Sequence, residues 1–176
     1  LRKQRGSGAT QRKKSDLARV HVLDVGQVDT ILVELPGKVW WMIDAYKWLN
    51  KSYDGHNKWI KDQGCKKLDR LIISHFHYDH IRYAEALIKD SQPDEGLVTD
   101  SYIHNTGTAR NLLTECVSRG ILRIVGATEQ LAFGSVSTQV SRTDGIPNAR
   151  ALKQEPNDHE LVVCLKTKQA RGLLPG

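Results

Sequence analysis

The sequence predicts a single domain of the α/β class, built as a mixed sandwich. Three observations predict it: strand patterns over residues 19–44, alternating strand and helix patterns from about residue 57 to 120, and a return to strand patterns after residue 121. A length of 176 residues fits one domain, and 39% hydrophobic with 26% charged residues is ordinary for a globular core.

Short strands are expected first. The segments "VHVLDV", "TILVEL" and "KVWWMID", at residues 20–25, 30–35 and 38–44, are rich in β-branched or aromatic residues. Gly, Pro or Asp bounds each of them, with Pro36 marking one of the turns. This pattern favours three strands joined by tight connections.

Helices and strands then alternate. A helix is expected near residues 57–64, a buried strand over 68–74, a helix over 81–90, a strand over 97–103 and a helix over 108–120, which Gly120 ends. Apolar spacing predicts two inward helix faces: Ile81, Ala84, Leu87 and Ile88 on one, and Leu112, Leu113, Cys116 and Val117 on the other. Residues 121–126, 129–141, 160–166 and 170–174 are strand-like.

Charge is concentrated at the N-terminus. The formal net charge is +6, and residues 1–14 hold six lysines and arginines and no acid. The other 20 basic residues balance 20 acidic ones, so the body carries no formal net charge. We therefore expect residues 1–15 to form a flexible basic arm and residues 16–176 to form the domain. Binding of phosphate groups by this arm is the alternative interpretation.

Hydropathy and cysteine content favour a soluble, cytoplasmic protein. No stretch approaches the roughly 20 apolar residues of a membrane span, and the N-terminus lacks the apolar region of a secretory signal. The three cysteines, Cys65, Cys116 and Cys164, are odd in number and lie far apart, so we expect reduced, buried thiols.

One segment carries chemistry. "HFHYDH", residues 75–80, directly follows the apolar run 68–73, so its side chains are expected at the carboxyl edge of a buried strand. His75 and His77 can point to the same side there, and Asp79 and His80 turn into the next helix. Imidazole and carboxylate groups suit one transition metal or two close together, which favours a hydrolytic site. A solvated histidine-rich loop is the alternative.

This motif after "LIIS" resembles the signature of the metallo-β-lactamase superfamily. Residues 20–45, "VHVLDVGQVDTILVELPGKVWWMIDA", resemble the opening strands of one branch, the β-lactamase-like domain of ComEC/Rec2-type proteins of competence DNA uptake. The resemblance runs from about Arg19 to Gly176. It implies an αββα sandwich, of which this chain covers the N-terminal half to two thirds.

The resemblance also implies a set of site residues. His75 and His77 would ligate a first metal, and Asp79 and His80 a second, with Asp79 also serving catalysis by holding the cation. His159 would be a further ligand, and zinc is the implied metal in a two-metal site, with manganese as the alternative. Asp44 would support the ligand loop by hydrogen bonding. Alternatives remain: a turn or capping role for Asp44 and a plain loop histidine for His159. His104 could line the rim of the site, with a surface position as its alternative.

The chain departs from the family pattern. Val28 and Tyr46 stand where the branch has glycine, and Arg82 and Tyr83 replace a Gly-Gly pair, which is expected to narrow the site. The sequence ends at Gly176, where the family pattern continues into a metal-bridging aspartate and the second half of the sandwich. We therefore expect a further domain, chain segment or protein partner to cover an exposed sheet face.

The predicted function is metal-dependent hydrolysis of a phosphodiester or nucleic acid through a metal-activated hydroxide, as in a nuclease. Nucleic acid is accordingly the expected partner. Two alternatives stay open: a catalytically silent sensor or assembly module, and a hydrolase of a small ester, thioester or lactam.

Overall fold

The computed structural model describes residues 17–26, 28–46, 52–99, 106–126, 128–142, 160–168 and 170–174. The expected basic arm, His104 and His159 lie outside these residues. In the described part of the chain, no helix has the length and apolar character needed to cross a bilayer.

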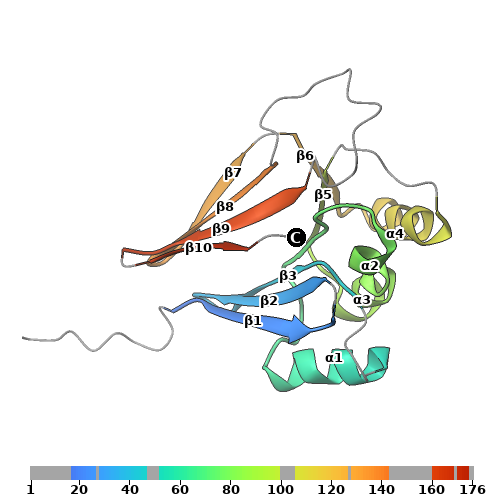
Figure 1. The fold of residues 1–176 in the computed structure, drawn as a ribbon, viewed down its shortest axis with the longest axis horizontal. Coiled ribbons are helices and arrows are strands. Elements are labelled where there is room, and N and C mark those ends of the chain that lie inside the picture. Colours follow the sequence, from blue (N-terminus) through green and yellow to red (C-terminus); the bar gives the residue numbers. More distant parts are fainter. Residues whose placement is uncertain are drawn as a thin grey trace, which may run out of the picture.

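Two sheets form the centre of the molecule (Figure 1). The first has six strands in sequence order: β1 (Arg19–Asp24), β2 (Asp29–Leu35), β3 (Val39–Ile43), β4 (Arg70–Ile72), β5 (Glu95–Thr99) and β6 (Leu122–Val125). Strands β1 to β3 pair antiparallel, whereas β3 to β6 pair parallel. The second sheet is antiparallel in the order β10-β9-β8-β7: β10 (Arg171–Leu174), β9 (Leu161–Lys166), β8 (Val136–Arg142) and β7 (Glu129–Phe133).

The described helices lie on the face of the first sheet that is turned away from the second (Figure 1). They are α1 (Tyr53–Asp62), α2 (Tyr78–Ile81), α3 (Ala84–Ser91) and α4 (Gly107–Ser118). Together with the two sheets they form helix–sheet–sheet layers, the arrangement expected for the N-terminal part of the predicted αββα sandwich, so the predicted fold class is confirmed.

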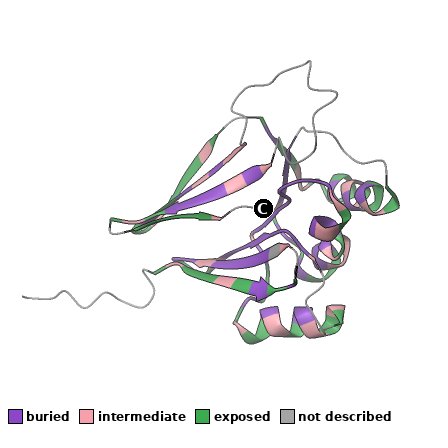
Figure 2. Ribbon diagram, viewed as in Figure 1, coloured by how far each residue is buried: buried purple, intermediate pink, exposed green. Residues whose placement is uncertain are grey.

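Side-chain alternation along the strands builds two cores. In β2, Leu32 packs on the helix side, whereas Ile31 and Val33 pack between the sheets. Trp41 and Met42 divide in the same way in β3. Because successive strand residues point to opposite faces, the central strands of the first sheet are buried on both sides and read as continuous apolar runs (Figure 2).

The helix boundaries and faces refine the sequence prediction. The helix expected over residues 81–90 is two helices, since the chain breaks at Arg82 and Tyr83 between α2 and α3. The face of Ile81, Ala84, Leu87 and Ile88 is buried, as predicted. The inward placement of Val117 was wrong: it is 62% exposed, because the buried stripe of α4 follows Ala109, Leu112 and Cys116. All three cysteines are buried and free.

The outer face of the second sheet is mixed in character. The pairing register places Ser137, Lys166 and Arg171 in one row on this face, and Gln139, Cys164 and Leu173 in the next. None of the described helices covers it (Figure 1). The surface that a covering partner would meet is therefore cationic and polar as well as apolar.

An ionic cluster links the sheets at the amino-terminal end of β4. The Arg70 guanidinium pairs with Glu95 at 2.6 Å and lies 5.0 Å from the Trp41 ring. Arg123 bridges Glu95 and Glu129, each at 2.7 Å, and so joins β6 to β7. This network closes one end of the sandwich and leaves the carboxyl ends of the parallel strands for chemistry.

Helix α1 buries a histidine. His56 is fully buried, and neither ring nitrogen has a hydrogen-bond partner among the described residues. Its ring lies 5.9 Å from that of Tyr83. Burial lowers the pKa of His56 from 6.5 to about 4, because a charged imidazole there would lose its hydration.

We predict that stability falls with acid through His56. The unfolded chain protonates this ring near pH 6.5 and the folded chain only near 4, so the unfolded state binds more protons in between. This effect of His56 on the free energy of unfolding amounts to about 3 kcal/mol. The stabilisation is complete above about pH 6.5 and lost by about pH 4. Urea denaturation across this range should give a flatter pH profile for His56→Leu than for the wild type. Equal profiles would contradict the assignment.

Candidate metal centre

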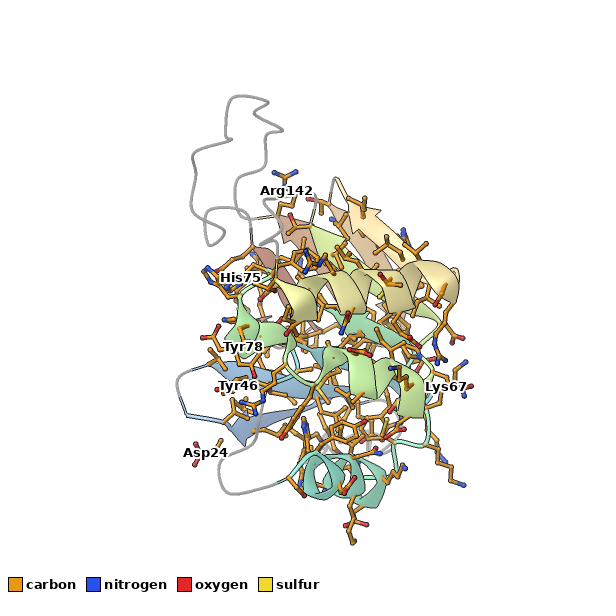
Figure 3. The ribbon with its side chains drawn as sticks, turned by 90° about the vertical axis from the view of Figure 1, so that its right-hand side faces the viewer. Asp24, Tyr46, Lys67, His75, Tyr78 and Arg142 are labelled. Atoms are coloured by element: carbon orange, nitrogen blue, oxygen red, sulfur yellow. The ribbon has the colours of Figure 1, made fainter. Side chains whose placement is uncertain are left out.

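The candidate site lies at the carboxyl edge of the parallel strands. Asp44 directly follows β3, and residues 74–77 follow β4, its parallel neighbour. Adjacent parallel strands end at the same edge, so residues 30 positions apart in sequence meet there. Figure 3 shows His75, Tyr78 and Tyr46 on this side of the molecule and Lys67, which precedes β4, on the other.

Asp44 is the centre of the hydrogen-bond network. It is fully buried, and its φ of 54° is left-handed, a conformation that aspartate adopts more readily than most side chains. Its backbone N–H donates to the Ile72 carbonyl at 2.8 Å. The carboxylate accepts from the Ser74 N–H at 2.8 Å, from the Ser74 hydroxyl at 2.6 Å, and from Nδ1 of His80 at 2.7 Å.

Three imidazoles cluster near this carboxylate, the His75 and His77 rings edge to face and the His75 and His80 rings tilted. Nε2 of His75 lies 2.9 Å from Nδ1 of His77, so these two nitrogens face one another. The His75 and His80 ring centroids are 3.9 Å apart. His75 and His80 are buried and His77 is half-buried, which leaves solvent access on the His77 side.

The charge balance at His80 follows from its neighbours. Burial alone lowers the pKa of this imidazole, but the hydrogen bond and charge of Asp44 outweigh that effect. The charges of Asp79 and Glu160 act in the same direction, so the pKa of His80 lies above its ordinary value. The carboxylates therefore stabilise positive charge at this position.

Two residues of the site were missed from the sequence. Ser74 was read only as the end of a strand, yet its hydroxyl contacts Asp44, Nδ1 of His75 at 3.0 Å and Nδ1 of His80 at 3.3 Å. Glu160 precedes β9, and its Oε1 lies 3.8 Å from Nδ1 of His75. Burial, opposed by His80 and aided by Asp44, raises the pKa of Glu160. The signal available in the sequence was an acidic residue, Glu160, directly before the apolar run of β9.

The structure brings together four of the predicted site residues: Asp44, His75, His77 and His80. Asp79 lies in the first turn of α2 and is half-exposed. His159 lies outside the described residues, next to Glu160 in sequence. Within the described ranges, no three or more His, Cys, Asp or Glu side chains are grouped so that they could hold a metal ion. The described part of the centre is thus a pair of facing nitrogens with its supporting carboxylates.

Of the bulky residues that were expected to narrow the site, three pack into the core, whereas Arg82 is exposed. Val28, Tyr46 and Tyr83 are partly buried against the helix-side cluster. Tyr83 stacks edge-on with Tyr53 at 5.2 Å, and its N–H donates to the Ala45 carbonyl at 2.7 Å. Much of their bulk therefore contacts the helix layer.

Comparisons with known proteins address the fold and the family. The sequence model of the Metallo-beta-lactamase superfamily matches residues 23–168. No curated protein matches the chain. Among solved structures, a motif mutant of a metallo-beta-lactamase from Cronobacter sakazakii shares 15% identity with a TM-score of 0.56, over 88% of this chain and 59% of its own.

Two further solved structures have the same fold. A metallo-beta-lactamase superfamily protein from Sulfolobus tokodaii shares 16% identity, with a TM-score of 0.52, over 84% of this chain and 60% of its own. CmlA, a diiron beta-hydroxylase from Streptomyces venezuelae, shares 16% identity, with a TM-score of 0.52, over 89% and 28%. The chain thus spans about three fifths or less of these relatives. Since the family match covers most of the sequence, the chain belongs to the metallo-beta-lactamase superfamily.

Proposed function

We propose that this chain carries the amino-terminal metal-binding part of a hydrolase that cleaves phosphodiester or nucleic-acid substrates. Members of the superfamily are largely metal-dependent hydrolases. The observation that carries the proposal is the pair of facing nitrogens, Nε2 of His75 and Nδ1 of His77, beside the buried Asp44 carboxylate.

Proton accounting supports a cation at this pair. An ionised carboxylate only accepts, so the single Ser74 hydroxyl proton is used in its 2.6 Å bond to Asp44. Ser74 Oγ must then accept from Nδ1 of His75, which leaves Nε2 of His75 with its lone pair. By the same reasoning Nδ1 of His80 donates to Asp44, and its Nε2 remains the nitrogen for a cation.

This donor set fits a borderline transition-metal ion such as zinc, which neutral imidazole binds well, with manganese as the alternative. His75, His77 and His80 would hold it, together with Asp79 and His159. A bound ion of this kind lowers the pKa of water and neutralises charge on a phosphoryl oxygen. Ser74 and Asp44 would fix the tautomers of the imidazoles, and the buried carboxyl edge of the first sheet would hold the ligand residues in place.

The rim of the site suits an anionic substrate. Tyr78, between His77 and Asp79 in sequence, is 49% exposed, and the Arg82 guanidinium lies 5.4 Å from its ring. Arg142 lies above His75 in Figure 3. The Tyr78 ring beside the Arg82 guanidinium is a combination that stacks bases and contacts phosphates, and it favours a polyanion.

Relationship to the ComEC/Rec2-type branch is part of this proposal and rests on the opening strands at residues 20–45. We also propose that a further segment or partner covers the outer face of the second sheet, since no described helix does so (Figure 1).

Two other functions are each favoured by an observation. The half-exposed Asp79 and the incomplete ligand group among described residues suit a catalytically silent sensor or assembly module. The formally neutral body suits a hydrolase of a small ester, thioester or lactam. Activity assays distinguish these functions from the leading one.

The first prediction concerns metal content. Replacing both His75 and His77 with alanine removes the facing nitrogens, so zinc retained after purification should fall to background by elemental analysis. His21→Ala is the control, because this half-buried imidazole lies on β1 against Trp59 and should leave metal content unchanged. Unchanged metal content in the double variant would remove the basis of the proposal.

The second prediction concerns Asp44. Asparagine also tolerates the left-handed backbone at this position, so Asp44→Asn isolates the carboxylate. Its amide N–H₂ cannot accept from His80 or Ser74, and we expect zinc affinity to fall by about 10- to 100-fold. Competition with a chromophoric chelator measures it, with circular dichroism as the check on folding. Wild-type affinity in a folded Asp44→Asn protein would contradict the supporting role.

The third prediction concerns the substrate. The purified chain should cleave a generic phosphodiester such as bis-(p-nitrophenyl) phosphate only with added zinc or manganese. The Arg82→Ala variant should bind single-stranded DNA more weakly, and its binding should depend less on salt concentration. Metal-dependent cleavage of esters or lactams without phosphodiesterase activity would favour the small-substrate enzyme. Metal binding with no hydrolysis of any of them would favour the silent module.

A further inference from the structure

Glu160 approaches His75 at ion-pair distance, farther away than Asp44 lies from His80. Its Oε1 lies 3.8 Å from Nδ1 of His75, and its side chain is 20% exposed. Resting on the metal site proposed above, we infer that Glu160 is a positioning residue: it holds His75 with Nδ1 protonated and Nε2 directed at the cation.

The backbone fixes Glu160 in this place. The N–H of Leu161, the first residue of β9, donates to the Ser74 carbonyl at 3.0 Å. Leu161 is itself fully buried between the sheets. The residue before it is therefore held against the loop that follows β4, although 85 positions separate Glu160 from His75. The segment that leads into β9 thus contributes a side chain to a site whose other described members follow strands of the first sheet.

The geometry distinguishes support from direct ligation. Glu160 approaches Nδ1 of His75, whereas His77 approaches Nε2. The two nitrogens lie on different edges of the imidazole ring, so Glu160 and the facing nitrogen pair lie on different sides of His75. A carboxylate in this position acts on the cation through the imidazole.

Ser74 alone is a weak support for His75. Its oxygen is shared, since Nδ1 of His75 lies 3.0 Å from it and Nδ1 of His80 lies 3.3 Å from it, while its proton belongs to Asp44. His80 has a carboxylate of its own as a second acceptor; the acidic group at His75 is Glu160. A carboxylate facing Nδ1–H favours that tautomer and makes Nε2 a stronger donor to metal.

The test compares Glu160→Gln with Glu34→Gln in the purified chain. Glu34 is a matched control, because its side chain is also 20% exposed and also in an ion pair, with Arg19 on β1. Zinc affinity, from chelator competition, should fall about 10-fold for Glu160→Gln. It should stay within about twofold for Glu34→Gln, since an exposed pair away from the site contributes little.

The second readout is the tautomer of His75 in the metal-free protein, from long-range ¹H–¹⁵N correlation spectra. The wild type should show the Nδ1–H form, and Glu160→Gln should gain Nε2–H form. Unchanged affinity and tautomer would overturn the inference. Weaker affinity with an unchanged tautomer would also overturn it, in favour of direct ligation. Should the wild type bind no zinc, the proposed function fails, while the tautomer comparison still decides the role of Glu160.

Discussion

The buried Asp44 carboxylate is the interaction on which the centre depends. A fully buried carboxylate is costly unless donors surround it, and here the Ser74 N–H, the Ser74 hydroxyl and Nδ1 of His80 all point at it. These donors belong to the loop after β4 and to α2. The hydrogen bonds to this one carboxylate therefore hold the end of β3, the end of β4 and helix α2 together. Its left-handed backbone is held by the hydrogen bond to Ile72.

The Ser74 hydroxyl, which donates to Asp44, determines the tautomers of the neighbouring imidazoles. A hydroxyl has one proton, and the carboxylate takes it, so the oxygen can only accept from the imidazoles beside it. The nitrogens on the other edges of His75 and His80 are then the ones left for a cation. An alanine at this position would keep the strand and the packing but lose the constraint that orients both rings. The fold brings the imidazoles close together, and the Ser74 hydroxyl determines which nitrogen of each ring faces away from it.

Much of the sandwich was readable from the sequence, because strands buried on both faces show long apolar runs and helices show one apolar stripe. Val117 was misplaced since Leu113 and Val117 extend the apolar spacing of α4 beyond the stripe that contacts the sheet. The sequence pointed to the histidines of residues 75–80 through their motif and to Asp44 through the family resemblance, and these side chains lie together. Glu160 was not, because its approach to His75 depends on how β9 docks on the loop after β4, and no local pattern encodes that contact. The role of Ser74 was hidden by its ordinary place at a strand end.

The side chain of Tyr83 helps to hold the segments of the site together. Tyr83 packs between Tyr53 and His56 of α1, while its N–H holds the Ala45 carbonyl and the Ala45 N–H holds the His80 carbonyl. The bulky side chain therefore joins helix α1 to the two segments that carry Asp44 and His80. Glycine would leave that junction without side-chain packing. Tyr83 therefore supports the backbone segments that carry the imidazoles and Asp44.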